Sequence, residues 1–224
     1  GINPLFHNES YIENAIKENK SLFLIQNKIT HIVHFAAQSH VQTSFSDAIT
    51  YTNDNIVGTH KLLEATRLYC QTLKLFIHVS TDEVYGSILE GSWDENEPLL
   101  PNSPYSASKA GADLLVLAYG KTYGMNVGIT RCCNNYGLRQ YPEKIIPLFV
   151  SNLIDGKRVP IYGDGKNVRE WIHVSDHTNA LTEIMMKGVR GSIYNIGTGD
   201  RLSNLELANA VIDLSNSNSS VEFV

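Results

Sequence analysis

The sequence predicts an α/β fold: a Rossmann-type, doubly wound parallel sheet with a smaller lobe toward the C-terminus. Apolar runs rich in β-branched residues alternate with segments that have helical spacing, and this alternation ends near residue 134. Strands that alternate with helices form parallel sheets, because each helix carries the chain back to the start of the next strand. The short pieces after residue 134 are separated by glycine and proline, which indicates the smaller lobe.

The expected strands are the apolar runs at 31–37, 75–80 and 127–132. A helix between about residues 55 and 70 is expected to have one largely apolar side, formed by Ile56, Leu62, Leu63, Thr66 and Tyr69. A second helix, beyond Tyr105, has a comparable side, formed by Ala107, Ala110, Leu114, Leu117 and Ala118. We expect both helices to pack on the sheet through these sides.

One element of a dinucleotide-binding sheet is not found before the first expected strand. Such a sheet normally opens with a strand, a Gly-rich turn and a helix whose N-terminus holds the pyrophosphate. Residues 1–28 instead contain a helical pattern, "YIENAIKENK". We therefore expect the N-terminal βαβ unit to be missing from this chain and the chain to be the middle of a longer polypeptide.

The composition narrows the class of protein. The chain has 224 residues, 42% hydrophobic and 18% charged, which are proportions of an ordinary globular protein. No apolar run approaches the roughly 18 residues of a membrane span, so no membrane partner is expected. A net charge of −5 argues against a broad nucleic-acid surface.

Cysteine and histidine spacing gives no sign of a metal. The three cysteines include no CxxC pair, which favours a reducing, cytoplasmic location. His173 and His177 are four residues apart, but "HVSDH" lacks the glutamate of a zinc-protease helix, so no metal is expected. Asp176, between them, is interpreted as the N-cap of a helix through Leu181.

Two acidic residues, Asp82 and Glu83, stand directly after the apolar run "LFIHVS" in the stretch "STDEVYG". Open α/β sheets bind their ligands outside the carboxyl ends of the strands, and these acids are expected at such an end. They are therefore candidates for general acid and base chemistry. The alternative is that the pair only solvates a loop.

Tyr105 and Lys109 form the strongest local pattern, "YSASK". Residues four apart on a helix lie on the same face, so the ammonium of Lys109 is expected to favour the phenolate and lower a pKa that starts near about 10. Tyr105 is then a candidate base for a hydroxyl proton. The alternative is a chance match on an ordinary helix.

Several stretches together resemble one family. They are "HFAAQSHV", "NIVGTHKLLEA", "HVSTDEVYG", "YSASKAGAD", "NNYG", "YPEKIIPL", "YGDGKNVREWIHVSDH" and "YNIG". The chain resembles the extended short-chain dehydrogenase/reductases and, within them, the nucleoside-diphosphate-glucose 4,6-dehydratases typified by dTDP-glucose 4,6-dehydratase. The resemblance covers roughly residues 31 to 212. Related epimerases usually have another residue in place of Asp82 or Glu83.

The resemblance implies a lyase of deoxysugar biosynthesis that uses NAD as its cofactor. Tyr105 would take the C4 hydroxyl proton while the C4 hydride passes to NAD+, and Thr81 would hydrogen-bond the C4 oxygen. Glu83 would then remove the C5 proton and Asp82 would protonate the departing C6 hydroxyl, after which the hydride returns to C6. Lys109 would also hold the nicotinamide ribose.

The resemblance also assigns binding residues and domains. The cofactor would be lined by Phe35, Ala36, Ala37, Ser39 and Asn135, in addition to Tyr105 and Lys109, with Ser39 facing the sugar. The sugar nucleotide would be held by Asn134, Lys144, Pro160, Tyr162, Arg169 and Asn195. Residues 1–138 would form an incomplete NAD-binding domain and residues 139–224 an incomplete, interleaved sugar-nucleotide lobe. Asp54 departs from the Thr often found at its position.

A homodimer is expected, because family members pair the two helices described above, and Leu68 and Leu115 are expected to be exposed on them. Three alternatives to dTDP-glucose dehydration stay open. The first is a UDP-glucose 4,6-dehydratase of the rhamnose route, which shares "HFAAQSHV". The others are another extended short-chain dehydrogenase, such as an epimerase or decarboxylase, and an inactive binding fragment.

Overall fold

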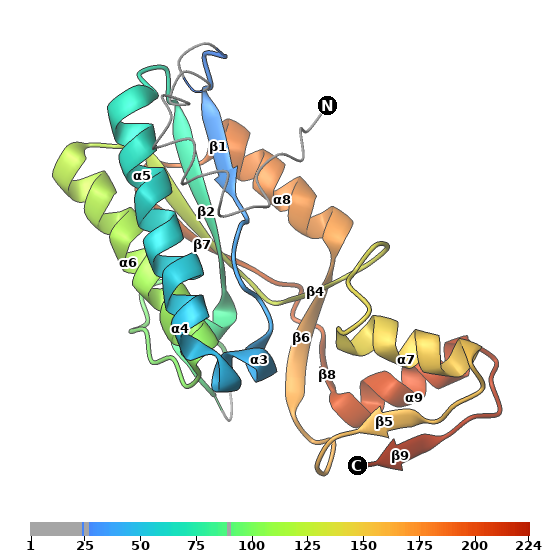
Figure 1. Ribbon diagram of the computed structural model, residues 1–224. Helices are drawn as coiled ribbons and strands as arrows, with labels where there is room; N and C mark the ends of the chain where they lie inside the picture. The colour runs from blue at the N-terminus through green and yellow to red at the C-terminus, as the bar shows by residue number, and fades with distance from the viewer. Residues whose placement is uncertain (1–23, 25–26, 89–90) are drawn as a thin grey trace. The chain divides into compact units, whose positions relative to one another are not determined.

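The computed structural model describes residue 24 and residues 27–88 and 91–224 (Figure 1). The helix expected at residues 11–20 lies outside these residues. The described contacts divide the chain into two units. The first unit contains the residues up to 132 together with 181–195, and the second contains 133–180 and 196–224.

The first unit is built on a four-stranded sheet, which confirms the predicted fold class. Its strands, in spatial order, are β1 (His31–His34), β2 (Leu75–Thr81), β3 (Val127–Cys132) and β7 (Ile193–Ile196). The β1–β2 and β2–β3 pairs are parallel. All seven residues of β2 are buried, as expected for the central apolar run. Strand β1 ends at His34, three residues earlier than predicted.

Six helical segments of the described chain connect or follow these strands. They are α3 (Val41–Ser46), α4 (Ala48–Tyr51), the π-helix η1 (Thr52–Val57), α5 (Gly58–Tyr69), the 3-10 turn η2 (Asp82–Tyr85) and α6 (Pro104–Tyr123). Helices α5 and α6 run side by side along the sheet (Figure 1). They enclose a core with the strands, made of Leu63, Phe76, Val116, Tyr119, Met125, Val127 and Ile129.

The side of α6 predicted to be buried is buried only in part. Ala110 is buried and Leu117 packs against the core, but Ala107, Leu114 and Ala118 are exposed. The prediction counted apolar side chains, whereas the buried side of α6 also includes Lys109 and Asp113, which find partners on β2 and β3.

The second unit has its own small sheets and core. Its strands are β4 (Asn134–Tyr136), β5 (Val159–Ile161), β6 (Val168–His173), β8 (Arg201–Ser203) and β9 (Val221–Phe223). Strand β6 pairs parallel with β4 and antiparallel with β8, and β5 pairs parallel with β9. Helices α7 (Ile145–Ile154) and α9 (Asn204–Leu214) pack with them around Phe149, Val159, Ile161, Trp171, Leu207, Ala208 and Ile212.

Helix α8 (Val174–Lys187) starts in the second unit and ends in the first. The prediction that Asp176 is its N-cap is wrong, because Asp176 lies inside the first turn. The start of the helix is instead occupied by His173, whose Nδ1 accepts a hydrogen bond from the backbone N–H of Ser175 at 3.3 Å. In the first turn, the negative charge of Asp176 still interacts favourably with the positive end of the helix dipole.

Candidate active site

The acid pair lies at the carboxyl end of the central strand, as predicted. Strand β2 ends at Thr81, and Asp82 and Glu83 begin the turn η2. The Thr81 Oγ1 atom caps this turn, accepting from the backbone N–H of Glu83 at 3.3 Å and donating to Asp82 Oδ1 at 3.2 Å. Gly86 ends the turn with a φ of 87°, and a Cβ there would collide with the carbonyl oxygen of Leu100. The chain can therefore leave the turn this way only with glycine.

Tyr105 is placed beside this turn by the start of α6. Ser103 is the N-cap in a capping box with Ser106, and Pro104 occupies the first turn, so the helix begins immediately before the tyrosine. The Tyr105 ring lies edge-on to Tyr51, with centroids 6.3 Å apart. Its hydroxyl is hydrogen-bonded to Thr81 and lies in the field of Glu83. The structure thus brings Thr81, Asp82, Glu83 and Tyr105 together.

The prediction that Lys109 lowers the pKa of Tyr105 is wrong for this structure. Burial, and next the negative charge of Glu83, raise the pKa of the Tyr105 phenol above its ordinary value, and only the hydrogen bond with Thr81 opposes them appreciably. The Lys109 side chain is directed elsewhere. Its Nζ donates to the carbonyl oxygen of Val79 at 2.8 Å and lies 3.4 Å from His78 Nε2.

Lys109 is itself perturbed by its surroundings. Burial lowers the pKa of its ammonium to about 8, and the negative charge of Asp113 partly opposes this effect. The neighbouring His34 is buried, and desolvation together with Lys109 lowers its pKa to about 3, so it is neutral at physiological pH. Of these two groups, Lys109 therefore carries the positive charge between β2 and α6.

The segment expected to line the cofactor follows β1 and is fixed at its centre. The backbone N–H of Gln38 donates to Asn55 Oδ1 at 2.7 Å, and Asn55 Nδ2 donates to the Gln38 carbonyl at 3.1 Å. Asn55 Nδ2 also donates to Ser108 Oγ at 2.8 Å, and that hydroxyl donates to the Tyr105 carbonyl at 2.7 Å. Phe35, Ala37 and Ser39 are exposed, and Ala36 is half-buried.

Asn55, Gln38 and Ser108 were missed as site residues. Asn55 and Asp54 lie in the π-helix η1, a rare form that is frequent at functional sites but has no sequence pattern that predicts it. Asp54, the residue that departs from the expected Thr, accepts from Gln38 Nε2 at 2.7 Å. It therefore adds a second contact to the same segment.

The two asparagines of "NNYG" both lie on β4 in the second unit. Asn135 Oδ1 pairs with His177 Nδ1 at 2.7 Å, and Asn135 Nδ2 donates to the Cys133 carbonyl at 3.0 Å. Asn134 Nδ2 donates to the carbonyl of Glu170 at 3.3 Å. His177 is a contact that the sequence reasoning did not find, although its buried position on α8 makes it a partner of the predicted cofactor residue.

The other expected nucleotide residues of the second unit come from three elements. Lys144 is the N-cap of α7, Pro160 lies in β5, and Tyr162 follows that strand with 71% of its surface exposed. Arg169 is exposed on β6, and its Nη1 donates to the backbone carbonyl of Val168 at 3.0 Å. A phenol ring and a guanidinium that both reach solvent are suited to a nucleotide base and its phosphates.

Asn195, on β7, belongs to the first unit. Its Oδ1 accepts from the hydroxyl of Tyr85 at 2.8 Å, and its Nδ2 donates to the Trp93 carbonyl at 3.1 Å. Its backbone N–H donates to Glu95 Oε1 at 2.8 Å. To contact a nucleotide, as expected, the Asn195 side chain would have to give up its hydrogen bonds to Tyr85 and Trp93.

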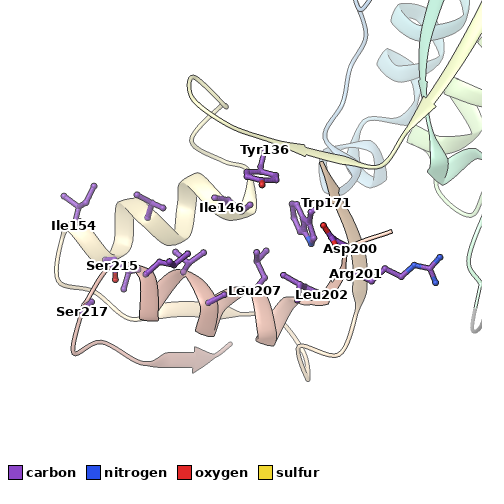
Figure 2. A pocket seen from close by; sticks show the side chains of 15 residues that line it. Tyr136, Ile146, Ile154, Trp171, Asp200, Arg201, Leu202, Leu207, Ser215 and Ser217 are labelled. Carbon is purple, nitrogen blue, oxygen red and sulfur yellow. The ribbon is translucent and has the colours of Figure 1, made fainter. Parts of the chain in front are cut away.

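A separate cavity of about 880 Å³ lies in the second unit, between α7 and α9 (Figure 2). Its lining is mostly apolar, and it includes none of the residues expected to bind the nucleotide. Arg201, at one end, lies 3.9 Å from the carboxylate of Glu170.

In the part of the chain that the structure describes, no three His, Cys, Asp or Glu side chains come together in a way that could hold a metal ion. Over the same residues, no helix combines the length and the apolar character that crossing a bilayer requires.

Comparison with known proteins decides the family. The sequence profile described as GDP-mannose 4,6 dehydratase matches residues 8–222. The chain belongs to this family. It is 52% identical over 181 residues to a dTDP-glucose 4,6-dehydratase of Streptomyces niveus, a match that covers 81% of this chain and 53% of that relative. The chain thus spans about half the length of the curated relatives it matches.

Solved structures agree with the assignment to the GDP-mannose 4,6 dehydratase family. DesIV, a dTDP-glucose 4,6-dehydratase from Streptomyces venezuelae solved with NAD bound, is 50% identical, with a TM-score of 0.86 over 91% of this chain and 64% of that one. A UDP-glucuronic acid 4-epimerase from Bacillus cereus has the same TM-score of 0.86 at 29% identity, covering 93% of this chain and 66% of the epimerase. The chain is thus an extended short-chain dehydrogenase/reductase, a superfamily that includes several sugar-nucleotide chemistries.

Proposed function

We propose that the protein carrying this chain is an NAD-dependent dTDP-glucose 4,6-dehydratase, a hydro-lyase. The observation that supports the dehydratase over an epimerase is the pair Asp82 and Glu83, held on one turn beside Tyr105. An epimerase needs only oxidation and reduction at one carbon. Elimination of water across C5 and C6 needs a base and an acid at two neighbouring carbons, and two neighbouring carboxyl groups match that need.

In this proposal Thr81 and Tyr105 hydrogen-bond the C4 oxygen of the glucose, and Tyr105 takes the C4 hydroxyl proton. Bound NAD+ supplies the hydride acceptor. Oxidation at C4 makes the C5 proton acidic, because the new carbonyl stabilises the resulting carbanion. Glu83 removes this proton, and Asp82 protonates the C6 hydroxyl so that it leaves as water. Hydride return to C6, with the proton on Glu83 going back to C5, completes a reaction with no net redox change.

The binding roles follow the two units. NAD would be held by Phe35, Ala36, Ala37, Ser39 and the amine of Lys109, and Asn135 is a further expected cofactor contact. Phe35, Ala37 and Ser39 are exposed, and their segment is held by the hydrogen bonds between Gln38 and Asn55, so this surface would be ordered before the cofactor arrives. The second unit would hold the nucleotide through Asn134, Lys144, Pro160, Tyr162 and Arg169.

The decisive test is product analysis with two sugar nucleotides. The protein that carries this chain is incubated with NAD and either dTDP-glucose or UDP-glucose, and the 4-keto product is detected by its absorbance under alkali. We expect product from both, with a kcat/KM at least tenfold higher for dTDP-glucose, since one or two contacts to the base and ribose are worth about 1 to 3 kcal/mol each. A higher kcat/KM for UDP-glucose would mean that UDP-glucose is the substrate. Epimerised sugar without keto product would contradict the proposed dehydratase activity.

We also propose a cytoplasmic homodimer that pairs α5 and α6 with their copies. Leu68 and Leu114 are exposed on these helices, at 49% and 59%. Leu115, expected to be exposed, packs instead against the core, so Leu114 takes its place on the surface. The side of α6 that carries Ala107, Leu114 and Ala118 supplies an apolar strip of small and medium residues, which suits helix packing.

The dimer is tested by light scattering at micromolar concentration. We expect the mass of two chains for the parent protein and of one chain for Leu114→Glu, because a buried, unpaired carboxylate at a helix contact is costly. Glu183→Gln, on the exposed side of α8, is a control that should leave the mass unchanged. A monomeric parent protein would remove this proposal.

A further inference from the structure

The turn η2 ends in a tyrosine, Tyr85, whose ring and hydroxyl both contact neighbouring side chains. The Tyr85 side chain is buried, with 2% of its surface exposed. Its hydroxyl donates to Asn195 Oδ1 at 2.8 Å and accepts from Arg131 Nη1 at 2.8 Å. Its ring lies 4.7 Å from the Arg131 guanidinium carbon and stacks on Trp93, with centroids 6.2 Å apart. Both the ring and the hydroxyl are therefore fixed in position.

Arg131 in turn is fixed by an acid on α6. Its Nε donates to Asp113 Oδ2 at 3.0 Å, and both side chains are almost completely buried. The other oxygen of Asp113 lies 3.6 Å from His78 Nε2 on β2. Tyr105, Lys109 and Asp113 follow one another at intervals of four residues, so they form one stripe along α6. The helix that carries Tyr105 thus also carries the acid that holds Arg131.

At the far end of this chain of contacts, Asn195 connects the turn to β7 and to the loop before α6. Its Nδ2 donates to the Trp93 carbonyl and its backbone N–H donates to Glu95 Oε1. Four segments therefore meet at the Tyr85 hydroxyl. They are α6 and β3 through Asp113 and Arg131, β7 through Asn195, and the turn η2 itself.

We propose that Asp113, Arg131, Tyr85 and Asn195 form a positioning relay that sets the place of the acid pair relative to Tyr105. Asp82 and Tyr85 are residues i and i+3 of the 3-10 turn η2, and side chains at these two positions lie one above the other. A shift of Tyr85 should therefore also shift Asp82. Buried ion pairs are often no more stabilising than apolar residues of the same volume, so stability alone gives little reason for Asp113 and Arg131 here. The relay acts on water elimination, which uses Asp82 and Glu83, more than on C4 oxidation.

This inference rests on the proposed function, and Tyr85→Phe tests it, because the variant removes one hydroxyl and keeps the ring. In the NAD-loaded protein with dTDP-glucose, we expect kcat to fall about 100-fold, the loss expected from a misplaced catalytic group. Oxidation at C4 should continue, so reduced cofactor should accumulate during a single turnover. The backbone amides of residues 82–86 should exchange hydrogen faster than in the parent protein.

Tyr119→Phe is the matched control. Tyr119 is also buried, and its hydroxyl bonds to Glu64 on α5, so the variant loses a comparable hydroxyl without touching the relay. It should keep the parent kcat and the parent exchange at residues 82–86. Equal losses in the two variants would show a general effect of lost stability and would reject the relay.

Asp113→Asn gives an independent variant in case Tyr85→Phe does not fold. Both variants act on the same turn, so the double variant should lose much less than the product of the two single losses. Losses that multiply, or an unchanged ratio of oxidation to elimination, would overturn the proposal. If the parent protein does not dehydrate dTDP-glucose, the proposed function fails, and the exchange of residues 82–86 alone then decides whether the relay holds the turn.

Discussion

Asp82→Asn is expected to slow the loss of water by about 10²- to 10⁴-fold, the usual contribution of general acid catalysis. The asparagine has the same shape and can still accept from the Thr81 hydroxyl, so the capped turn should persist. It cannot give a proton to the departing C6 hydroxyl. Oxidation at C4 should therefore proceed while elimination stalls. The measurement is single-turnover absorbance of NADH, which should rise and remain instead of appearing transiently.

Glu83→Gln separates the two acids. Without the base at C5, the exchange of the C5 proton with deuterated solvent should be lost, whereas in Asp82→Asn that exchange should continue. The control is Glu206→Gln, in the exposed first turn of α9, which should retain the parent rate. If Asp82→Asn and Glu83→Gln both turn over normally, the two carboxylates only solvate a loop and the dehydratase proposal is wrong.

The sheet and the place of the acid pair could be predicted because they depend on short-range patterns. An unbroken apolar run such as Leu75–Thr81 has few alternatives to a central strand, and polar residues at its end must lie at the carboxyl edge of the sheet. The "YSASK" pattern likewise placed Tyr105 correctly, because Ser103 and Pro104 start the helix just before it.

The buried polar contacts could not be predicted from such patterns. The sequence gives no sign that Asp113 and Arg131 are buried together, because charged side chains are rarely buried without a partner and each partner lies on another element. The same limit explains why the side of α6 predicted to be buried is only partly buried. Counting apolar residues along a helix assumes that the buried side is apolar, and Lys109 and Asp113 break that assumption.

The pKa of Tyr105 shows a related limit. Spacing alone puts Lys109 on the same face as the tyrosine, but it does not show where a long, flexible side chain ends. In the structure the Lys109 amine donates to the Val79 carbonyl, and burial together with the charge of Glu83 raises the pKa of Tyr105. The sequence therefore predicted the direction of the Tyr105 pKa shift incorrectly, because it could not show where the Lys109 amine ends.

Tyr105→Phe is the second substitution with a large expected effect, and it tests the role of Tyr105 as a base with a raised pKa. Removing the phenol should slow C4 oxidation by about 10²- to 10⁴-fold, as expected for loss of a general base. In contrast to Asp82→Asn, no NADH should accumulate, because the first step itself is blocked. The ring can keep its edge-on contact with Tyr51, so the fold should be unaffected. Stopped-flow absorbance of NADH under single-turnover conditions measures the step.

The raised pKa adds a pH dependence to this prediction. A base whose pKa lies above the working pH is mostly protonated, so the rate of C4 oxidation in the parent protein should rise with pH, by up to about tenfold per unit between roughly pH 6 and 9. Tyr105→Phe should lose this slope together with the rate. A rate in the parent protein that is flat over this range would mean that Tyr105 is already ionised when substrate is bound. A Tyr105→Phe variant that oxidises C4 at the parent rate would assign the base to another residue.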